Sequence, residues 1–562
     1  MLSPYWKGGR GLAWTAAAAL IGLYFLFFFK SAVDIPFGDD YAPLGFVVNF
    51  TNPEWGVGKA SQILDQHNEH RIATLRLTLL LWYALRHEVN FILIAFLGNA
   101  AVVGIALLLA RRLKTSAGGA GGPPSWAFLP VFFLLFQPQH FQLMLWALCT
   151  YTNVVVVLLA FLSLYLLTRK RTGKSASWAF ASAAVLAVIA SYTNGNGLFV
   201  FLAGVVVLLV GKDFRRLAPW ILIGGLTAFF YFQGYVRNPA HPDIWPYLKE
   251  HFFGVVEYFL AVTGAWADFG VLRPFASVAA GILVMAGFVG LTVRGLFRKS
   301  PFVSAAALFV LISLGALTWT RAPFTVLQSY EPRYKFTAVV LLVLLYLGGL
   351  AVAREKKRKA VAAGFLVFSV IFGGLSYAHN IPKLRAYGPV LADNLIRWNA
   401  WRADLPFASP EQAEEILRLT VQRKIYQPPP RLGILRPVYP FGFIDPAGGT
   451  AAAPSADGEV VVSGWALDNG GPPRIIVRRS PLPGDPESVL NRKKLVYVGQ
   501  TRCAAGTVPN VARVYYGFPG RETMLWTYRF RPADYAGSPE PPTLYFFARD
   551  RAGRENLLGT IR

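Results

Sequence analysis

The chain has 562 residues, of which 54% are hydrophobic and only 15% are charged, and its mean hydropathy is +0.42. Soluble proteins carry roughly 25% charged residues, so this composition excludes an ordinary soluble enzyme, a fibrous protein and a disordered chain. The net charge of +25 does not indicate nucleic-acid binding, because the basic residues occur in short runs between apolar segments. Cys149 and Cys503 lie in dissimilar surroundings, so we expect no disulfide between them.

Eleven apolar segments predict membrane-spanning helices, since a span needs about 20 mostly apolar residues. The first is too long for a signal-peptide core and is expected to stay as an anchor. Residues 72–85 are also apolar, but Arg76 in their middle favours an interfacial helix. The eleven segments are residues 11–29, 89–110, 126–136, 141–167, 178–190, 198–210, 217–232, 275–293, 302–319, 336–352 and 361–377.

Basic clusters then predict the topology. Cytoplasmic loops carry an excess of Lys and Arg, and two of the predicted spans separate each pair of neighbouring clusters. The N-terminus is therefore expected in the cytoplasm and everything after Tyr377 outside, in a multi-pass protein of a bacterial cytoplasmic (inner) membrane. The clusters are Lys7 with Arg10, residues 111–114, 169–171, 212–216, 294–299 and 354–359.

The C-terminal third differs in composition from the rest of the chain and predicts two further regions. They follow a membrane domain of residues 1–377, in which residues 30–88 are the first outer loop. Residues 378–454 combine an amphipathic helix near residues 411–423 with a Pro-rich linker. Residues 455–562 predict an extracytoplasmic β-sandwich, because short β-rich runs alternate with Gly and Pro. The expected strands are residues 459–468, 474–479, 494–498, 524–530 and 543–548.

The first outer loop carries two polar motifs. Asp39 and Asp40 are adjacent carboxylates that can raise one another's pKa, hold a divalent cation or cap a helix. The stretch 67–71, His-Asn-Glu-His-Arg, offers a base, an acid and a guanidinium group, or forms the polar start of a helix. The i, i+3 spacing of His67 and His70 also suits a metal ion, but the pattern supplies no third fixed ligand.

Positively charged residues on the predicted outer side depart from the rule that Lys and Arg gather in cytoplasmic loops, so they need a local explanation. They are Arg321 and the basic residues of the run Tyr330-Glu331-Pro332-Arg333-Tyr334-Lys335. A cation at the membrane edge is a functional hypothesis by default, and arginine offers bidentate donors to a phosphate. Arg333 is therefore expected either to bind a lipid phosphate or to lock two loops together by pairing with Glu331 or Asp34.

Two further features place polar and aromatic groups at the outer edge. Residues 194–197, Asn-Gly-Asn-Gly, are expected to form a helix-hairpin turn in which Gly and Asn supply positive φ angles, and their amides could line a sugar pocket. Trp146 is expected in the interfacial aromatic belt or in the same pocket. Residues 237–268 are expected to form a long loop that covers a pocket.

Together these groups predict a site with carboxylates, cations and aromatic rings, open to lipid on the outer face. Soluble nucleotide-activated substrates belong to the cytoplasm, so an outward-facing enzyme needs a donor that lipid delivers. A polyprenyl-phosphate sugar suits the groups. Its phosphate needs Arg or Lys, its sugar stacks on Trp and Tyr, and a carboxylate takes the proton of the acceptor hydroxyl.

This layout resembles the GT-C superfamily of integral-membrane glycosyltransferases, through its eleven predicted spans, the acidic motif in the first outer loop and the outward C-terminal domain. Within it, Gly38-Asp39-Asp40-Tyr41, residues 67–71, residues 194–197 and Arg333-Tyr334 resemble a group of poorly characterised bacterial multi-span proteins. The resemblance implies that Asp39 or Asp40 is the base. The C-terminal region resembles, in architecture alone, the carbohydrate-binding modules of some arabinosyltransferases. No Trp-Trp-Asp motif of the oligosaccharyltransferase type is present.

The expected function is transfer of a sugar from a polyprenyl-phosphate donor to a glycan or lipid acceptor of the cell envelope, in polysaccharide biosynthesis. A divalent cation, Mg²⁺ or Mn²⁺, at Asp39 and Asp40 is left open. The predicted roles are catalysis by Asp39, Asp40 and Glu69; donor phosphate binding by His70, Arg71, Arg333 and Lys335; and sugar or acceptor binding by His67, Tyr41, Asn194, Asn196, Trp146 and Tyr330.

Three alternatives stay open. A polysaccharide polymerase or ligase that uses a lipid-pyrophosphate donor would need the same outer Arg and His residues. A transporter or flippase of lipid-linked sugar would be expected to show internal repeats and charges at mid-membrane depth, whereas these acids lie at one face. A non-catalytic envelope protein would bind through the C-terminal domain.

Overall fold

A computed structural model of the chain divides into two compact units, Met1–Leu384 with Leu419–Tyr426 and Arg385–Arg418 with Gln427–Arg562, and each is described by itself. Within them the structure describes residues 5–51, 59–115, 123–169, 173–237, 242–401, 405–429, 440–445, 458–468, 471–482, 485–486, 495–508, 522–531 and 542–561.

The first unit is helical, and among the described residues eight helices are long and apolar enough to cross a membrane. An α-helix satisfies its own backbone hydrogen bonds, which makes it the natural form for uninterrupted apolar runs in hydrocarbon. The chain is therefore a multi-pass membrane protein. The eight helices are α1 (Tyr5–Ser31), α5 (Phe91–Thr115), α8 (Ala147–Thr168), α9 (Lys174–Ser191), α14 (Phe275–Val293), α16 (Pro301–Arg321), α17 (Pro332–Val352) and α18 (Glu355–Trp401).

Three of the eleven segments predicted to span do not give such a helix. Residues 126–136 contain α6 (Leu129–Leu135), which has 7 residues and is followed by the turn η2 (Pro138–His140) and α7 (Phe141–Leu145). Residues 198–210 give the 12-residue α10 (Phe199–Val210), preceded by η3 (Gly195–Leu198). Residues 217–232 lie in α11 (Phe214–Tyr231), whose two arginines at the start lower its mean hydropathy.

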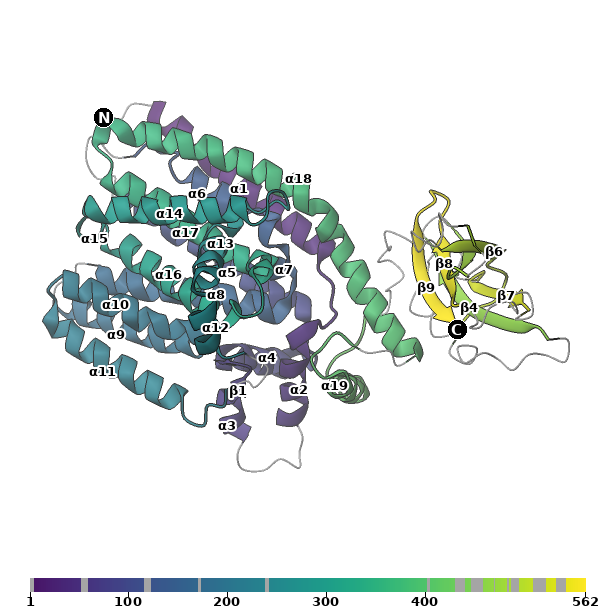
Figure 1. Ribbon diagram of the computed structural model, residues 1–562. Helices are drawn as coiled ribbons and strands as arrows, with labels where there is room; N and C mark the ends of the chain where they lie inside the picture. Colours follow the sequence, from purple (N-terminus) through teal and green to yellow (C-terminus); the bar gives the residue numbers. More distant parts are fainter. Residues whose placement is uncertain are drawn as a thin grey trace. The chain divides into compact units, whose positions relative to one another are not determined.

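Two helices lie at the centre of this unit. Of the most apolar window in each, 78% of the residues are buried in α17 and 72% in α8, against 22% in α1. Figure 1 shows α9, α10 and α11 as neighbouring helices, and α16 also packs against α10 and α17. A buried amide ties three helices together: Asn99 of α5 accepts a hydrogen bond from Tyr24 of α1 at 2.5 Å and donates one to the Met144 carbonyl of α7 at 2.8 Å.

Short elements connect the long helices. The described residues of the first connecting segment, 32–51 and 59–88, contain six elements: η1 (Gly38–Asp40), α2 (Tyr41–Phe50), α3 (Lys59–Leu64), the strands β1 (Gln66–His67) and β2 (His70–Arg71), and α4 (Ala73–Arg86). The stretch 237–268, expected to be a loop, instead contains α12 (Ile244–Glu250), α13 (Phe252–Thr263) and η4 (Ala265–Ala267). The remaining short helices of this unit are α15 (Leu296–Lys299) and η5 (Val326–Tyr330).

The second unit contains two antiparallel sheets. Every strand expected from the sequence is present, although Lys494 at the start of one lies outside the described residues, and β3 and β9 were not predicted. One sheet has the order β3-β4-β7, with β3 (Phe441–Ile444), β4 (Val460–Leu467) and β7 (Leu525–Phe530). The other has the order β6-β5-β8-β9, with β5 (Arg474–Arg479), β6 (Val496–Arg502), β8 (Leu544–Arg549) and β9 (Glu555–Ile561). The expected amphipathic helix is α19 (Pro410–Gln422).

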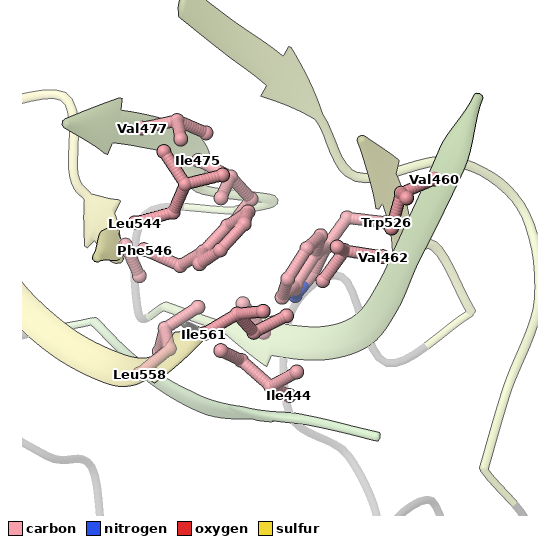
Figure 2. Packing of buried hydrophobic residues seen from close by; sticks show 12 residues of the cluster. Ile444, Val460, Val462, Ile475, Val477, Trp526, Leu544, Phe546, Leu558 and Ile561 are labelled. Atoms are coloured by element: carbon pink, nitrogen blue, oxygen red, sulfur yellow. The ribbon is translucent and has the colours of Figure 1, made fainter. Parts of the chain in front are cut away.

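The two sheets share one hydrophobic core. Alternate residues of a strand point to the same face, and Val460 and Val462 of β4 face inward together with Leu544 and Phe546 of β8. Figure 2 shows the indole of Trp526, from β7, between these side chains, and its ring stacks on Phe546 at a centroid distance of 5.5 Å. Both cysteines of the chain are free thiols.

We predict that Trp526→Ala in the full chain destabilises the second unit by about 3–5 kcal/mol, because it removes a large aromatic side chain from a closed core. The measurement is the rate of proteolysis within residues 440–561 as urea concentration rises. Tyr497→Ala is the matched control, because the Tyr497 side chain is 58% exposed. Equal protease resistance of the Trp526→Ala variant and the wild-type chain would contradict this description of the core.

Candidate functional site

A cavity of about 480 Å³ lies in the first unit, where the first connecting segment meets the ends of several helices. Its walls come from η1, the β1–β2 hairpin, the start of α8, η3, the end of α11, the last turns of α16 and the first turn of α17. The residues predicted from the sequence that line it are Asp39, His67, Glu69, His70, Trp146, Asn194, Asn196 and Arg333.

Asp39 and Asp40 face different surroundings. Asp40 is only 2% exposed, and its carboxylate accepts hydrogen bonds from the backbone N–H groups of Phe37 at 3.2 Å and Leu148 at 2.8 Å. Asp39 lines the cavity instead. Gly38 makes this turn possible: its φ is +54°, and a Cβ atom there would lie 2.9 Å from the Trp146 ring. Asp40 therefore anchors the turn and Asp39 faces the cavity.

His67 and His70 face one another across a hairpin. The expected helix start is replaced by β1 and β2, in which His67 pairs with His70, while Asn68 in the turn has φ of +49°. Burial lowers the pKa of His67, and it lowers the pKa of His70 to about 4. Both imidazoles are therefore neutral at pH 7, and each presents one donor and one acceptor nitrogen.

Opposite charges meet at the cavity wall. Glu69, in the hairpin turn, lies 3.4 Å from the guanidinium group of Arg321 at the end of α16. Both side chains are partly buried, so the pair is less screened by water than a surface salt bridge. Arg321 thereby joins the hairpin to a long apolar helix and keeps its positive charge at the cavity.

Arg333 lies in the first turn of α17, with its guanidinium carbon 5.4 Å from the ring centroid of Trp146 and 5.1 Å from that of Tyr334. Such cation–π contacts orient a guanidinium group. Arg333 also donates a hydrogen bond to the Tyr334 side chain, and the charge of Glu331 acts on it. Of the two loop partners suggested by the sequence, Asp34 instead accepts hydrogen bonds from Asn90 and from the backbone of Phe91. The Arg333 donors are thus directed by aromatic rings on the cavity wall.

Asn194 and Asn196 line the cavity from the turn before η3 and from η3 itself. The expectation that the glycines here supply positive φ angles is wrong, since neither Gly195 nor Gly197 adopts one. They allow close approach instead. A Cβ atom at Gly195 would lie 2.9 Å from Nδ1 of His70, and one at Gly197 would lie 2.1 Å from the Ala190 carbonyl oxygen.

Arg71 does not line the cavity. Its side chain is buried and donates hydrogen bonds to backbone carbonyls, at 2.6 Å to Tyr231 and also to Leu64 and Gln233. The guanidinium group therefore holds the hairpin to the end of α11. The last carbonyl groups of a helix such as α11 have no N–H partner within the helix, and Arg71 supplies donors to them.

Lys335, Tyr330 and Tyr41 are also buried away from the cavity. The Lys335 ammonium group lies 2.9 Å from the carboxylate of Asp268, which also forms a bidentate pair with Arg273 at 2.6 Å. Burial opposes ionisation of Asp268, but hydrogen bonds from Arg273 and the charge of Lys335 hold its pKa at about 2. Tyr330 lies beneath the Arg273 guanidinium group.

Several buried polar atoms on the cavity wall have no hydrogen-bond partner among the described residues. They are Nε2 of His67, Nδ1 of His70, Nε1 of Trp146, Oδ1 of Asn196 and Nε of Arg333. A buried polar atom without a partner costs roughly 1–3 kcal/mol, and such atoms are rare in folded proteins. Their convergence on one cavity indicates a polar ligand with both donors and acceptors.

The donor set does not fit a divalent cation shared by Asp39 and Asp40. Both oxygens of Asp40 already accept backbone N–H groups. Within the described part of the chain, no three His, Cys, Asp or Glu side chains lie together in a way that could hold a metal ion.

Sequence reasoning missed one whole wall of the cavity. This wall contains Tyr231, Tyr235, Cys149 of α8 and five residues of α16: Ser313, Leu314, Ala316, Leu317 and Thr320. These residues lie within apolar runs or just after them and carry no local motif. The polar residues that α16 contributes are Ser313 and Thr320, and such residues are common inside membrane helices.

Comparisons with known proteins add nothing to this description: no protein-family model, no curated protein and no solved structure matches the chain.

We predict a pH-dependent contribution of Asp40 to stability. Burial raises its pKa from 3.8 to about 7, so the folded chain keeps a proton that the unfolded chain has lost. The resulting stabilisation is complete below the unfolded pKa and disappears as the pH rises through about 7. The melting temperature of Asp40→Asn, minus that of the wild type, is therefore expected to increase between about pH 5 and pH 8.

The control is Asp243→Asn, because the Asp243 side chain is half exposed. Differential scanning fluorimetry of both variants in one detergent gives the comparison. A pH-independent difference between Asp40→Asn and the wild type would show that Asp40 does not titrate in this window.

Proposed function

We propose that this protein is a membrane glycosyltransferase that moves a sugar from a polyprenyl-phosphate donor to a hydroxyl group of an envelope glycan or lipid. One observation carries the proposal. A single cavity at the ends of apolar helices brings together two carboxylates, two neutral imidazoles and two guanidinium groups, and several buried polar atoms on its wall have no partner among the described residues.

The chemistry is a displacement at the anomeric carbon. The acceptor oxygen forms the new C–O bond, the bond from the anomeric carbon to the phosphate oxygen breaks, and the acceptor proton passes to a carboxylate. Asp39 is the proposed base, because Asp40 is occupied by two backbone N–H groups and Glu69 is paired with Arg321. The neutral His67 and His70 hydrogen-bond to sugar hydroxyls, together with Asn194 and Asn196.

Arg333 is the proposed ligand of the donor phosphate. Its guanidinium group is oriented by Trp146 and Tyr334, and Arg321 adds a second positive charge on the same cavity. Negative charge builds up on the phosphate as the sugar leaves, and fixed cations in a partly dry site stabilise it. The proposal assigns structural roles to Arg71 and Lys335, because backbone carbonyls and Asp268 use their donors.

An apolar wall supports a lipid-borne donor. Leu314 and Leu317 of α16, Phe199 of α10 and Phe232 after α11 all line the cavity, and Phe232 is 53% exposed. A large exposed aromatic ring is expected where a membrane protein meets hydrocarbon. In this proposal the cavity faces the outside of a bacterial inner membrane, and the prenyl chain leaves it along this wall.

The second unit is the proposed acceptor-binding part. If its two sheets form a sandwich of the carbohydrate-binding type, exposed aromatic rings on the outer strands would be the contact points for sugars. Tyr497 on β6 is such a ring. Stacking on aromatic faces suits the apolar side of a pyranose or furanose ring.

We predict that Asp39→Asn lowers turnover about 10²–10⁴-fold, the usual contribution of a general base, and leaves donor binding unchanged. The assay measures release of polyprenyl phosphate from a panel of radiolabelled polyprenyl-phosphate pentoses and hexoses by the purified full chain. Native mass spectrometry measures binding of the same donors.

Asp65→Asn is the matched control, because Asp65 belongs to the same segment, is exposed and does not line the cavity. It is expected to keep wild-type turnover. A wild-type chain that turns over no donor of the panel, or an Asp39→Asn variant as active as the wild type, would be incompatible with the proposal.

Arg333→Ala is expected to weaken donor binding about 10–100-fold while slowing chemistry less, because it removes charge-assisted hydrogen bonds to the phosphate. Arg333→Lys keeps the charge and is expected to recover part of the affinity. Arg86→Ala, at the exposed end of α4, is the control. Donor affinity that does not change in Arg333→Ala would count against the phosphate role.

A further inference from the structure

A second cavity, of about 620 Å³, lies at the other end of the α16–α17 helix pair. The candidate site contacts the last turns of α16 and the first turns of α17. This second cavity instead contacts Ser300 just before α16, Val303 of α16 and the last turn of α17 up to Val352. A helix rises about 1.5 Å per residue, so Arg333 and Leu350 are roughly 25 Å apart along α17. That distance approaches the thickness of a bilayer's hydrocarbon core, so the cavities belong to opposite faces.

The lining of this cavity is strongly basic. Arg112, Lys299, Arg354 and Arg358 line it, and Glu355 is the one carboxylate among the described lining residues. The four cations come from α5, α15, the α17–α18 connection and α18, so the fold gathers charges that are far apart in the sequence. A concave basic surface with low-dielectric walls concentrates anions.

Side chains, rather than helix dipoles, supply this positive field. Two helices begin at the cavity, α16 at Pro301 and α18 at Glu355. Two others end there or close by, α17 at Val352 and α5 at Thr115. The partial positive charges of helix starts and the partial negative charges of helix ends therefore largely cancel.

The cavity also has an apolar side. Leu113, Val303, Leu347 and Leu350 line it, and all four belong to helices that are candidate membrane spans. A small soluble anion needs no such wall, whereas the glycerol and first acyl carbons of a phospholipid do. Basic pockets between membrane helices are a known mode of anionic headgroup recognition.

We propose that this cavity binds a phosphate-bearing anion, supplied by the headgroup of an anionic phospholipid at the face opposite the candidate catalytic site. Three of the basic clusters that predict topology thereby have a second role, since they contribute Arg112, Lys299 and the pair Arg354 and Arg358. The site is separate from the sugar-transfer cavity and does not depend on its function.

The test uses the delipidated full chain in a neutral detergent and measures binding of phosphatidylglycerol by native mass spectrometry. The double variant Lys299→Ala, Arg354→Ala removes two exposed cations, which spares the more buried arginines and therefore the fold. Each removed cation is expected to weaken binding roughly fivefold, so the double variant is expected to bind about 25-fold less tightly. Arg215→Ala, Arg294→Ala removes two exposed cations outside the cavity and is expected to bind as the wild type.

The result that overturns the site is equal phosphatidylglycerol binding by the wild type and the cavity variant, or equal losses in both double variants. A second experiment adds inorganic phosphate as a competitor of the lipid. Failure of millimolar phosphate to displace the lipid supports the headgroup assignment. Displacement by phosphate, with phosphate binding lost in the cavity variant, overturns the lipid source and assigns a free phosphate to the site.

Discussion

The candidate site depends on one buried carboxylate. Asp40 accepts the backbone N–H groups of Phe37 and Leu148, and so joins the turn after the first membrane helix to the start of α8. Burying a carboxylate is costly unless hydrogen bonds compensate for the lost water, and unpaired amides at the membrane are costly as well. Because each group satisfies the other, the turn is held in place and the neighbouring Asp39 is held at the cavity wall.

The same principle separates two kinds of cation. Arg71 and Lys335 are buried, and their donors are used by backbone carbonyls and by Asp268, so they hold loops to helix ends. Arg321 and Arg333 reach the cavity instead, where a carboxylate and aromatic rings orient them. Hydrogen bonds within the protein thus account for the donors of Arg71 and Lys335, and for this reason we assign structural roles to these two cations.

The role of a polar residue in a membrane protein thus has to be assigned from the groups that surround it. The basic runs between spans are predicted to mark cytoplasmic loops, through the charge asymmetry that orients membrane helices. At the ends of α5, α15, α17 and α18 the fold also brings such residues together around a cavity with an apolar wall. A basic loop that orients a span can also form the wall of the proposed headgroup site, because both need positive charge at the membrane face.

The sequence by itself determined the local properties of this chain. Long apolar runs predicted the eight candidate membrane helices, and alternating runs predicted five of the seven strands of the second unit, because hydropathy and periodicity act within about twenty residues. Only the tertiary structure decided which acidic and basic residues share a cavity. Asp39 and Asp40 are indistinguishable as neighbours in a sequence, and the partner that separates them, the Leu148 N–H group, lies 108 positions away. The anchoring of the His67–His70 hairpin to the end of α11 through Arg71 likewise depends on a contact between distant segments, which no local pattern encodes. The same holds for the placement of Arg333 beside Trp146 and of Lys335 beside Asp268.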